Sequence, residues 1–129
     1  MKIAVIHGQE HHGSTYNITR LFLDKLAGEN TEIVEFFMPR DTPPSCVGCC
    51  NCFVKGELFC PHAEIVQPVV RAIEEADLVV LASPCYVFGM TGQLKTFLDH
   101  MGYRWMAHRP HPQMFRKIGL AVSTAAGAG

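Results

Sequence analysis

Apolar and polar residues follow two different periods along this sequence, and segments of one period alternate with segments of the other. Short runs of β-branched and other apolar residues, ended by glycine or polar residues, are typical of buried strands. Longer segments repeat apolar residues every three or four positions, which is the spacing of one helix face. The pattern predicts strands at 2–6, 32–37, 77–82 and 117–123, and helices at 14–27, 63–75 and 92–101. In the second helix we expect regular structure to begin near Gln67, so that Pro68 lies in the first turn, where proline is tolerated.

This alternation of strand and helix predicts the class of fold. Strands that are apolar throughout indicate a parallel sheet covered on both faces, and the helices between them are the crossovers. We therefore expect a single domain over residues 1–129, with a doubly wound, three-layer α/β/α fold. Ligands of such sheets bind outside the carboxyl ends of the strands. The expected site is therefore formed by segments 8–17, 83–92 and 123–129.

Composition and charge narrow the classes of function. The chain has 129 residues, of which 48% are hydrophobic and 18% charged, and this excludes a disordered polymer. Eleven Lys and Arg against twelve Asp and Glu give a net charge of −1, so no overall positive field favours nucleic acid or an anionic membrane as a partner. The first apolar run is too short for a signal peptide, and no segment approaches the roughly 20 apolar residues of a membrane span. We expect a cytoplasmic protein.

The loop after the first predicted strand has the character of an anion site. It reads Gly-Gln-Glu-His-His-Gly-Ser-Thr over residues 8–15 and leads into a helix, whose free N–H groups and dipole attract negative charge. The hydroxyls of Ser14 and Thr15 can add donors, as can Gln9 and Asn17. The spacing is neither a dinucleotide fingerprint nor a Walker loop, which leaves the terminal phosphate of a mononucleotide. The alternative is that Gly13 and Ser14 only cap the helix.

Two stretches of sequence carry a resemblance to a known family. Residues 8–15 resemble a Gly-Ser-x-Arg-x-x-Gly-Asn-Thr motif, with Gln9 for the usual Ser, His11 for the Arg and Ser14 for the Asn, and with one residue fewer between His11 and Gly13. Residues 76–89 resemble an Ala-Asp, apolar strand, Ser-Pro-x-Tyr segment, and residues 92–99 match Gln-x-Lys and Phe-x-Asp positions. On these motifs the chain resembles the NADPH-dependent FMN reductase family of flavodoxin-like flavoproteins over its whole length.

The resemblance implies an FMN site and assigns residues to it. Residues 83–89 would lie along the ribityl chain and the isoalloxazine ring, with stacking surface from Tyr86 and Phe88. Residues 124–127 would lie near the pyrimidine edge of the ring. The implied cofactor-binding residues are Gln9, His11, Gly13, Ser14, Thr15, Asn17, Ser83, Pro84, Cys85, Tyr86, Val87, Phe88, Gly89, Thr124, Ala125 and Gly127. No catalytic side chain is expected, because the cofactor carries the chemistry.

Five of the six cysteines lie close together in a loop rich in Pro and Gly, inserted at 41–61. Cys46, Cys49 and Cys52 have two-residue spacing, and Cys60 follows at a distance, directly before a proline. This arrangement echoes ferredoxin ligation, and it is similar to the compact motif of the iron–sulfur flavoprotein subgroup, which implies a [4Fe–4S] cluster on these four residues. Free thiols and a tetrahedral zinc site are the open alternatives.

Three functions follow from these features. The first is an NAD(P)H-dependent oxidoreductase that passes electrons through FMN to a small acceptor such as a quinone or a flavin. The second is an iron–sulfur flavoprotein that exchanges electrons with a ferredoxin-like protein. The third is a non-enzymatic thiol or zinc module that senses redox state.

The end of the sequence carries two further expectations. A small-residue loop follows the fourth strand without a final helix, so we expect a chain truncated after that strand, lacking one strand and one helix of a five-stranded flavodoxin-like fold. The strand edge left open, and the basic, aromatic loop at 103–115, which contains His108 and Arg109, favour a homodimer or tetramer. That loop is either a flap that receives a nicotinamide phosphate or covers the flavin, or a solvated or subunit-contact loop.

Overall fold

The computed structural model describes residues 1–105 and 111–127, and it contains one four-stranded parallel sheet. The strands are β1 (Lys2–His7), β2 (Glu32–Phe37), β3 (Leu78–Pro84) and β4 (Ile118–Thr124), in the order β2-β1-β3-β4. The longer helices are α1 (Ser14–Leu26), α3 (Ala63–Glu75) and α4 (Gly92–Asp99). The parallel pairing of all neighbours confirms the doubly wound, flavodoxin-like fold expected from the sequence.

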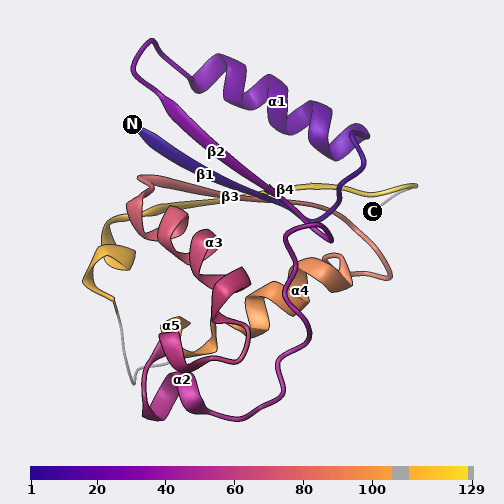
Figure 1. The fold of residues 1–129 in the computed structure, drawn as a ribbon. Coiled ribbons are helices and arrows are strands. Elements are labelled where there is room, and N and C mark those ends of the chain that lie inside the picture. The colour runs from indigo at the N-terminus through magenta and orange to yellow at the C-terminus, as the bar shows by residue number, and fades with distance from the viewer. Residues whose placement is uncertain (106–110, 128–129) are drawn as a thin grey trace.

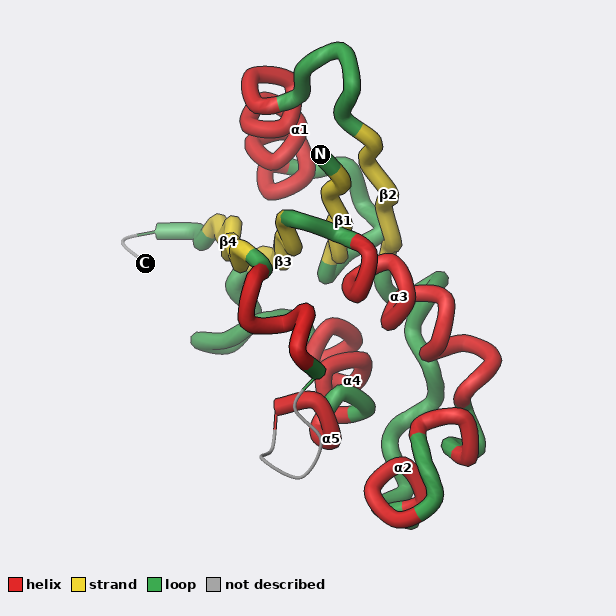
Figure 2. Tube along the Cα trace, turned by 90° about the vertical axis from the view of Figure 1, so that its left-hand side faces the viewer, coloured by secondary structure: helices red, strands yellow, loops and turns green. Residues whose placement is uncertain are grey.

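The helices form layers on both faces of the sheet (Figure 1). On one face α1 packs against β3 and β4, and its Leu23 joins Ile3, Val5 and Val80 in a buried apolar cluster. On the other face α3 and α4 cover the sheet with a second cluster that includes Phe97. The turned view in Figure 2 shows the same separation of α1 from α3 and α4. Burial on both faces explains why β1 and β3 read as continuous apolar runs.

Helix α3 differs from the expectation. It begins at Ala63 and not near Gln67, so Pro68 lies inside the helix and beyond its first turn. The carbonyl of His62 already accepts the amides of Ile65 and Val66, and the buried residues Val66 and Val69 lie on either side of the proline. Burial of this continuous apolar face outweighs the one backbone hydrogen bond that proline cannot make.

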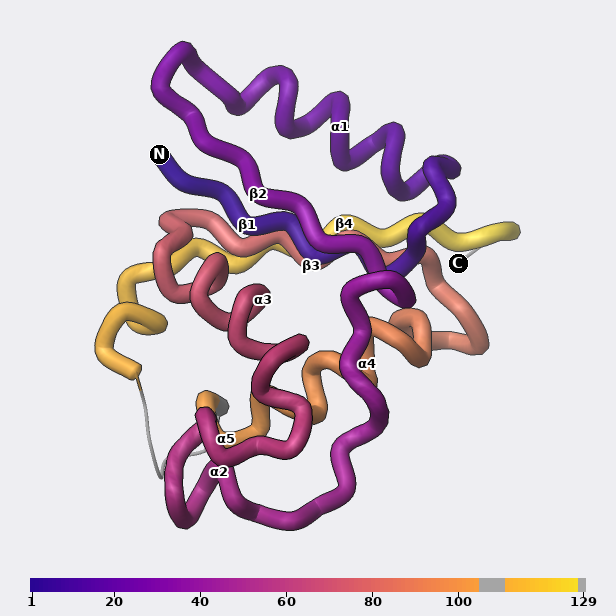
Figure 3. Tube along the Cα trace, viewed as in Figure 1, coloured from indigo at the N-terminus to yellow at the C-terminus, as the bar shows by residue number. Residues whose placement is uncertain are grey.

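Two segments expected to be irregular contain short helices. The cysteine-rich segment includes α2 (Asn51–Val54) and a 3₁₀ turn at Glu57–Phe59. The later segment contains α5 (Gly102–Trp105) and a 3₁₀ turn at Pro112–Arg116, whereas His108 and Arg109 lie outside the described residues. Figure 3 traces the chain from β2 past α4 to α2, a path that places the carbonyl of Pro44 2.7 Å from His100. Across the described ranges, no helix has the length and apolar character needed to cross a membrane.

Candidate functional site

A cavity of about 410 Å³ lies at the carboxyl edge of the sheet, where the three predicted segments meet. Its size falls within the usual range of small-molecule sites, about 300–1,000 Å³. Ten of the residues expected to bind cofactor line it: Gln9, His11, Gly13, Ser14, Thr15, Pro84, Cys85, Tyr86, Thr124 and Ala125. His7, Tyr16, Ala82 and Ala126 complete the lining. The cavity thus combines a helix N-terminus, two strand ends and a small-residue loop.

Six of the expected residues do not line this cavity: Asn17, Ser83, Val87, Phe88, Gly89 and Gly127. Asn17 is exposed on α1. The Ser83 side chain is buried behind the cavity, where its hydroxyl accepts from the Thr91 amide at 3.0 Å. Val87 and Phe88 are 93% and 101% exposed, so of the two aromatic residues expected at the ring Tyr86 lines the cavity and Phe88 projects into solvent.

Val87 and Phe88 form the tip of a tight turn beside the cavity. Tyr86 and Gly89 exchange backbone hydrogen bonds of 2.8 and 3.1 Å, and the two residues between them have φ angles of 49° and 62°. Left-handed backbone is costly for β-branched and bulky residues, and strain of this kind concentrates at functional sites. Gln9 donates to the Tyr86 hydroxyl at 3.2 Å, which joins this turn to the first loop.

Buried hydroxyls hold the loops in place. The Thr91 hydroxyl donates to the Gly8 carbonyl at 2.6 Å and accepts from the Leu94 amide at the start of α4. Thr15 and Thr124 share a hydroxyl hydrogen bond of 2.6 Å, which ties the first turn of α1 to the end of β4. Because these bonds are made within the protein, the loop geometry is preorganised before any ligand binds.

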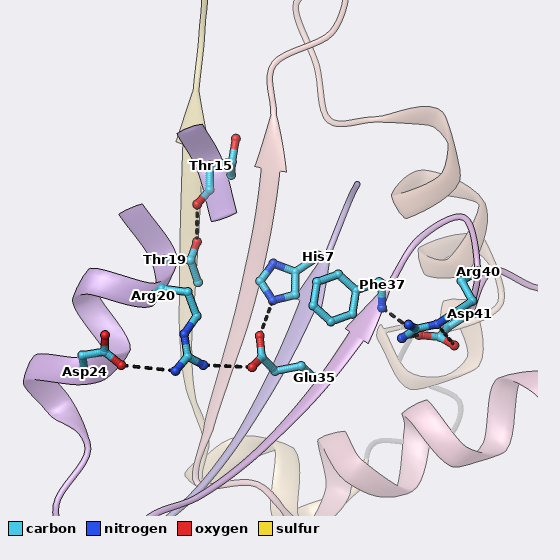
Figure 4. A network of polar contacts seen from close by, with 9 residues as sticks. All are labelled: His7, Thr15, Thr19, Arg20, Asp24, Glu35, Phe37, Arg40 and Asp41. Atoms are coloured by element: carbon cyan, nitrogen blue, oxygen red, sulfur yellow. Dashed lines mark hydrogen bonds and ion pairs between the residues drawn. The ribbon is translucent and has the colours of Figure 1, made fainter. Parts of the chain in front are cut away.

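His7 is a cavity residue that sequence reasoning missed. It is 2% exposed, and its Nε2 lies 2.7 Å from a carboxylate oxygen of Glu35. The ring stacks on Phe37, with centroids 4.4 Å apart and planes 9° from parallel. Figure 4 shows Arg20 on the far side of Glu35, where it donates to the second carboxylate oxygen at 2.9 Å and reaches Asp24 as well. Burial lowers the pKa of His7 below its ordinary 6.5, although the contact with Glu35 acts in the opposite direction.

The residues of this cavity fit a phosphorylated flavin. The N-terminus of α1, with Ser14 and Thr15, offers donors and a favourable dipole for a phosphate. Pro84, Tyr86 and Ala125 offer apolar and aromatic surface suited to a flat ring. At Gly13 a Cβ would lie 2.9 Å from Nε2 and Cδ2 of His11, which shows how closely the imidazole lies over this residue.

A second, smaller cavity of about 70 Å³ gathers the cysteines. Cys46, Cys49, Cys52 and Cys60 all line it, together with Cys50, His62 and His100. Burial and the neighbouring Cys60, Cys46 and Cys49 raise the pKa of the Cys52 thiol, which reflects how closely the sulfurs lie. Within the described ranges, no three His, Cys, Asp or Glu side chains are already positioned around a metal ion.

His100 fixes one side of the cysteine cavity. Its Nε2 lies 2.7 Å from the Pro44 carbonyl, which can only accept, so this nitrogen carries a proton. In the neutral ring Nδ1 is then an acceptor, and the Cys60 sulfur lies 3.8 Å from it. The four thiols thus share one cavity, with His100 at its edge.

Known sequences match this chain over nearly its whole length. The family model described as NADPH-dependent FMN reductase covers residues 1–129. An iron–sulfur flavoprotein of Archaeoglobus fulgidus is 28% identical over 127 residues, which are 98% of this chain and 55% of the relative. One from Methanocaldococcus jannaschii is 33% identical over 128 residues, 98% of this chain and 63% of the relative. The chain therefore spans less than two thirds of the length of these relatives.

Solved structures share the fold at lower sequence identity. An azoreductase from Bacillus anthracis superposes with a TM-score of 0.74 at 18% identity, over 99% of this chain and 70% of the azoreductase. The NAD(P)H:(acceptor) oxidoreductase FerB of Paracoccus denitrificans superposes with a TM-score of 0.62 at 21% identity, over 98% of this chain and 62% of FerB. These likenesses show the fold alone.

Proposed function

The chain belongs to the NADPH-dependent FMN reductase family, and we propose that it binds FMN at the carboxyl edge of its sheet and passes electrons from NAD(P)H to a small acceptor such as a quinone or a flavin. The observation that carries this proposal is the cavity of about 410 Å³, in which three separate loops bring phosphate donors and ring-binding surface together. When bound, FMN supplies the chemistry, accepting a hydride and returning electrons to an acceptor.

The residues of this chain bind and orient the cofactor. The N–H groups at the start of α1 and the hydroxyls of Ser14 and Thr15 hold the phosphate. Tyr86 and the end of β3 position the ring, while the Gly8–Thr91–Ser83 hydrogen bonds keep the two loops at a fixed separation. The role of the protein is therefore binding and orientation, without an acid–base side chain.

Titration of the protein with FMN tests this function. We expect the flavin fluorescence to be quenched at a stoichiometry of one FMN per chain, and the loaded protein to oxidise NAD(P)H when a quinone or free flavin is present. Ser14→Ala should weaken FMN binding several-fold, because a hydroxyl donor at the helix N-terminus is lost. Ser45→Ala, at an exposed position away from the cavity, is the matched control and should bind as the unmodified chain does. Unquenched FMN would overturn the proposal.

A second candidate function is electron transfer through a [4Fe–4S] cluster to a ferredoxin-like protein. It is favoured by the convergence of Cys46, Cys49, Cys52 and Cys60 on one cavity and by the names of the iron–sulfur flavoprotein relatives. Such a cluster would supply one-electron exchange beside the flavin. Helix α4 runs between the surroundings of the two cavities: Thr91, before the helix, donates to the Gly8 carbonyl beside the larger cavity, and His100, after it, lines the cysteine cavity.

Iron and acid-labile sulfide in anaerobically purified protein test this candidate. We expect about four of each per chain, with loss of both in Cys52→Ser or Cys60→Ser. Cys50→Ser is the matched control, because Cys50 lines the same cavity but stands outside the proposed ligand set. Bound zinc in a protein without flavin would favour the thiol or zinc sensing module instead. An iron-free protein that binds FMN would exclude the cluster and support the function as a small-acceptor reductase.

A further inference from the structure

The FMN cavity lacks a permanent positive charge among its described residues. No Lys, Arg, Asp or Glu lines it, and its ionisable side chains are those of His7, His11, Tyr16, Cys85 and Tyr86. Of these, histidine alone becomes a cation on protonation. A dianionic phosphate bound here can be paired with a cationic side chain only if His7 or His11 takes up a proton.

His11 lies at the N-terminus of α1, where its protonated ring could pair with the negative charge of a phosphate. Its ring lies over Gly13, the residue directly before the helix, because a Cβ on Gly13 would meet Nε2 and Cδ2 of the imidazole at 2.9 Å. The side chain is exposed and lines the cavity, with Glu10 as the adjacent charged residue in the loop. An imidazolium at this position adds to the favourable potential of the helix dipole.

His7 lies at the floor of the cavity, where its protonated ring could pair with the same phosphate. Its Nε2 faces the Glu35 carboxylate, which can only accept when ionised, so Nε2 carries the proton and Nδ1 is the nitrogen left to be protonated. Figure 4 shows Nδ1 on the side of the ring toward Thr15, which also lines the cavity. Protonation at Nδ1 would therefore create a donor on the cavity side while Glu35 holds the opposite nitrogen.

The surroundings of His7 make this proton dependent on a bound anion. Glu35 from β2 favours the cation, whereas burial opposes it, and so do His12 from the loop and Arg20 from α1. Tyr16 of α1 contacts the ring at a centroid distance of 5.5 Å. A phosphate in the cavity would add a second negative charge to that of Glu35 and so favour the protonated ring.

We propose that phosphate recognition in this cavity is coupled to proton uptake by His7 and His11, so that FMN binds more tightly as the pH falls through neutrality, whereas riboflavin, which lacks the phosphate, does not. The inference rests on the proposed FMN function and specifies how its anion is held. Each proton taken up on binding changes the affinity by as much as tenfold per pH unit, in the window between the pKa values of the free and bound states.

The test compares FMN with riboflavin at pH 7.0, 7.75 and 8.5, where the phosphate, with a second pKa of about 6, stays mainly dianionic. We expect the Kd of FMN to rise by about three- to tenfold per pH unit and that of riboflavin to change by less than about twofold. Calorimetry in two buffers of different ionisation enthalpy should show on the order of one proton taken up per FMN, and none per riboflavin. Parallel pH profiles for the two flavins would overturn the inference while leaving the FMN function standing.

Variants test whether the pH dependence of FMN binding comes from the two histidines and not from other residues of the site. His11→Asn, at an exposed position, and His7→Asn should each flatten the FMN profile, and the double variant should bind FMN with the shallow profile of riboflavin. His62→Asn is the matched control, since His62 lies in the cysteine cavity, outside the lining of the FMN cavity, and its variant should keep the wild-type profile. A profile unchanged in the folded His11→Asn and double variants counts against the proposal.

Failure of the FMN function would give a different result. If neither flavin binds, inorganic phosphate replaces them as the probe in the same calorimetric measurement. Proton uptake that disappears in the double variant would support the histidine coupling by itself, whereas phosphate binding without uptake would overturn it. Absence of any phosphate binding would overturn it as well.

Discussion

Gly8 lies where β1 comes closest to the loop after β3. A Cβ at this position would stand 2.7 Å from the Thr91 hydroxyl oxygen and 2.8 Å from that of Ser83, closer than real Cβ atoms approach. Both hydroxyls are engaged in the hydrogen bonds that hold the loops, so neither can move without breaking one. The requirement for glycine here comes from this close approach.

We expect Gly8→Ala to lower the free energy of unfolding by about 2 kcal/mol, because the added methyl group forces apart a buried hydrogen-bonded pair. FMN binding should weaken in the same variant as the loops separate. Urea unfolding and flavin titration measure the two effects. Gly28→Ala is the control, since nothing lies within 4 Å of a Cβ built there, and it should change stability by less than about 0.5 kcal/mol. Equal effects of the two substitutions would refute this account of Gly8.

His7 also makes stability depend on pH. Its folded-state pKa lies below the ordinary 6.5, so between these values the unfolded chain binds more protons than the folded one. The free energy of unfolding should therefore be fully retained above pH 6.5 and fall as the pH is lowered through this window. Urea unfolding at pH 7.5 and 5.5 should show a smaller drop for His7→Asn than for the unmodified chain or for Ser45→Ala, at an exposed position outside the cavity. The same drop in all three would rule out His7 as the source.

The sequence predicted much of the cavity at the scale of single residues, because parallel strands place their carboxyl ends at one edge. The polar loop residues such as Ser14 and Thr15 could be found in this way. His7 could not, since its role depends on the register that sets β1 beside β2 and brings Glu35 within 2.7 Å of its ring. The sequence signal was a histidine at the end of an apolar strand, directly before a glycine.

At the scale of elements, Arg104 of α5 connects the cysteine-rich segment to α3. Its side chain is 5% exposed, forms an ion pair with Glu74 of α3, and lies 3.8 Å from Glu57 in the 3₁₀ turn before Cys60. A buried charge removed from such a contact leaves its partner carboxylate without compensation. The contact therefore contributes both to stability and to the position of the cysteines.

Arg104→Met should lower the free energy of unfolding by about 2 kcal/mol, because Glu74 loses its buried partner. Hydrogen exchange over residues 46–60 should accelerate, since the segment loses its tie to α3. Lys95→Met supplies the comparison, because Lys95 pairs with Asp99 on the exposed face of α4, and a loss of less than about 0.5 kcal/mol is expected there. Unchanged exchange in Arg104→Met would show that the segment is held by other contacts.

Element boundaries were predictable where one local rule applied and not where two competed. The range of β2 was predicted as 32–37 and observed as Glu32–Phe37, because its alternating pattern has a single interpretation. The start of α3 was wrong because a proline rule was given more weight than an apolar face that continues through it. Helices of four residues, such as α2 (Asn51–Val54), depend on tertiary contacts that a local pattern does not contain.

At the scale of the whole molecule, the two faces of β4 differ. Leu120 and Val122 pack beneath α1, whereas Gly119 and Ala121 alternate with them on the opposite face, along an apolar cavity of about 350 Å³ that Ile118 and Leu120 also line. Ile118 is 68% exposed, and among the described strands β4 pairs with β3 alone. An exposed strand edge with apolar surface promotes association with another chain.

We therefore expect the isolated chain to form a homodimer or tetramer through this side of β4. Ile118→Lys should shift the mass measured by light scattering toward the monomer, because a charge at the apolar surface would be desolvated in the assembly. Leu21→Lys is the matched control, since Leu21 is 62% exposed on α1 and does not line the cavity beside β4, and its variant should keep the wild-type mass. A monomer at every micromolar concentration tested would contradict the association itself. An oligomer equally stable in both variants would place the interface elsewhere, and the exposed side of β4 would then need another explanation.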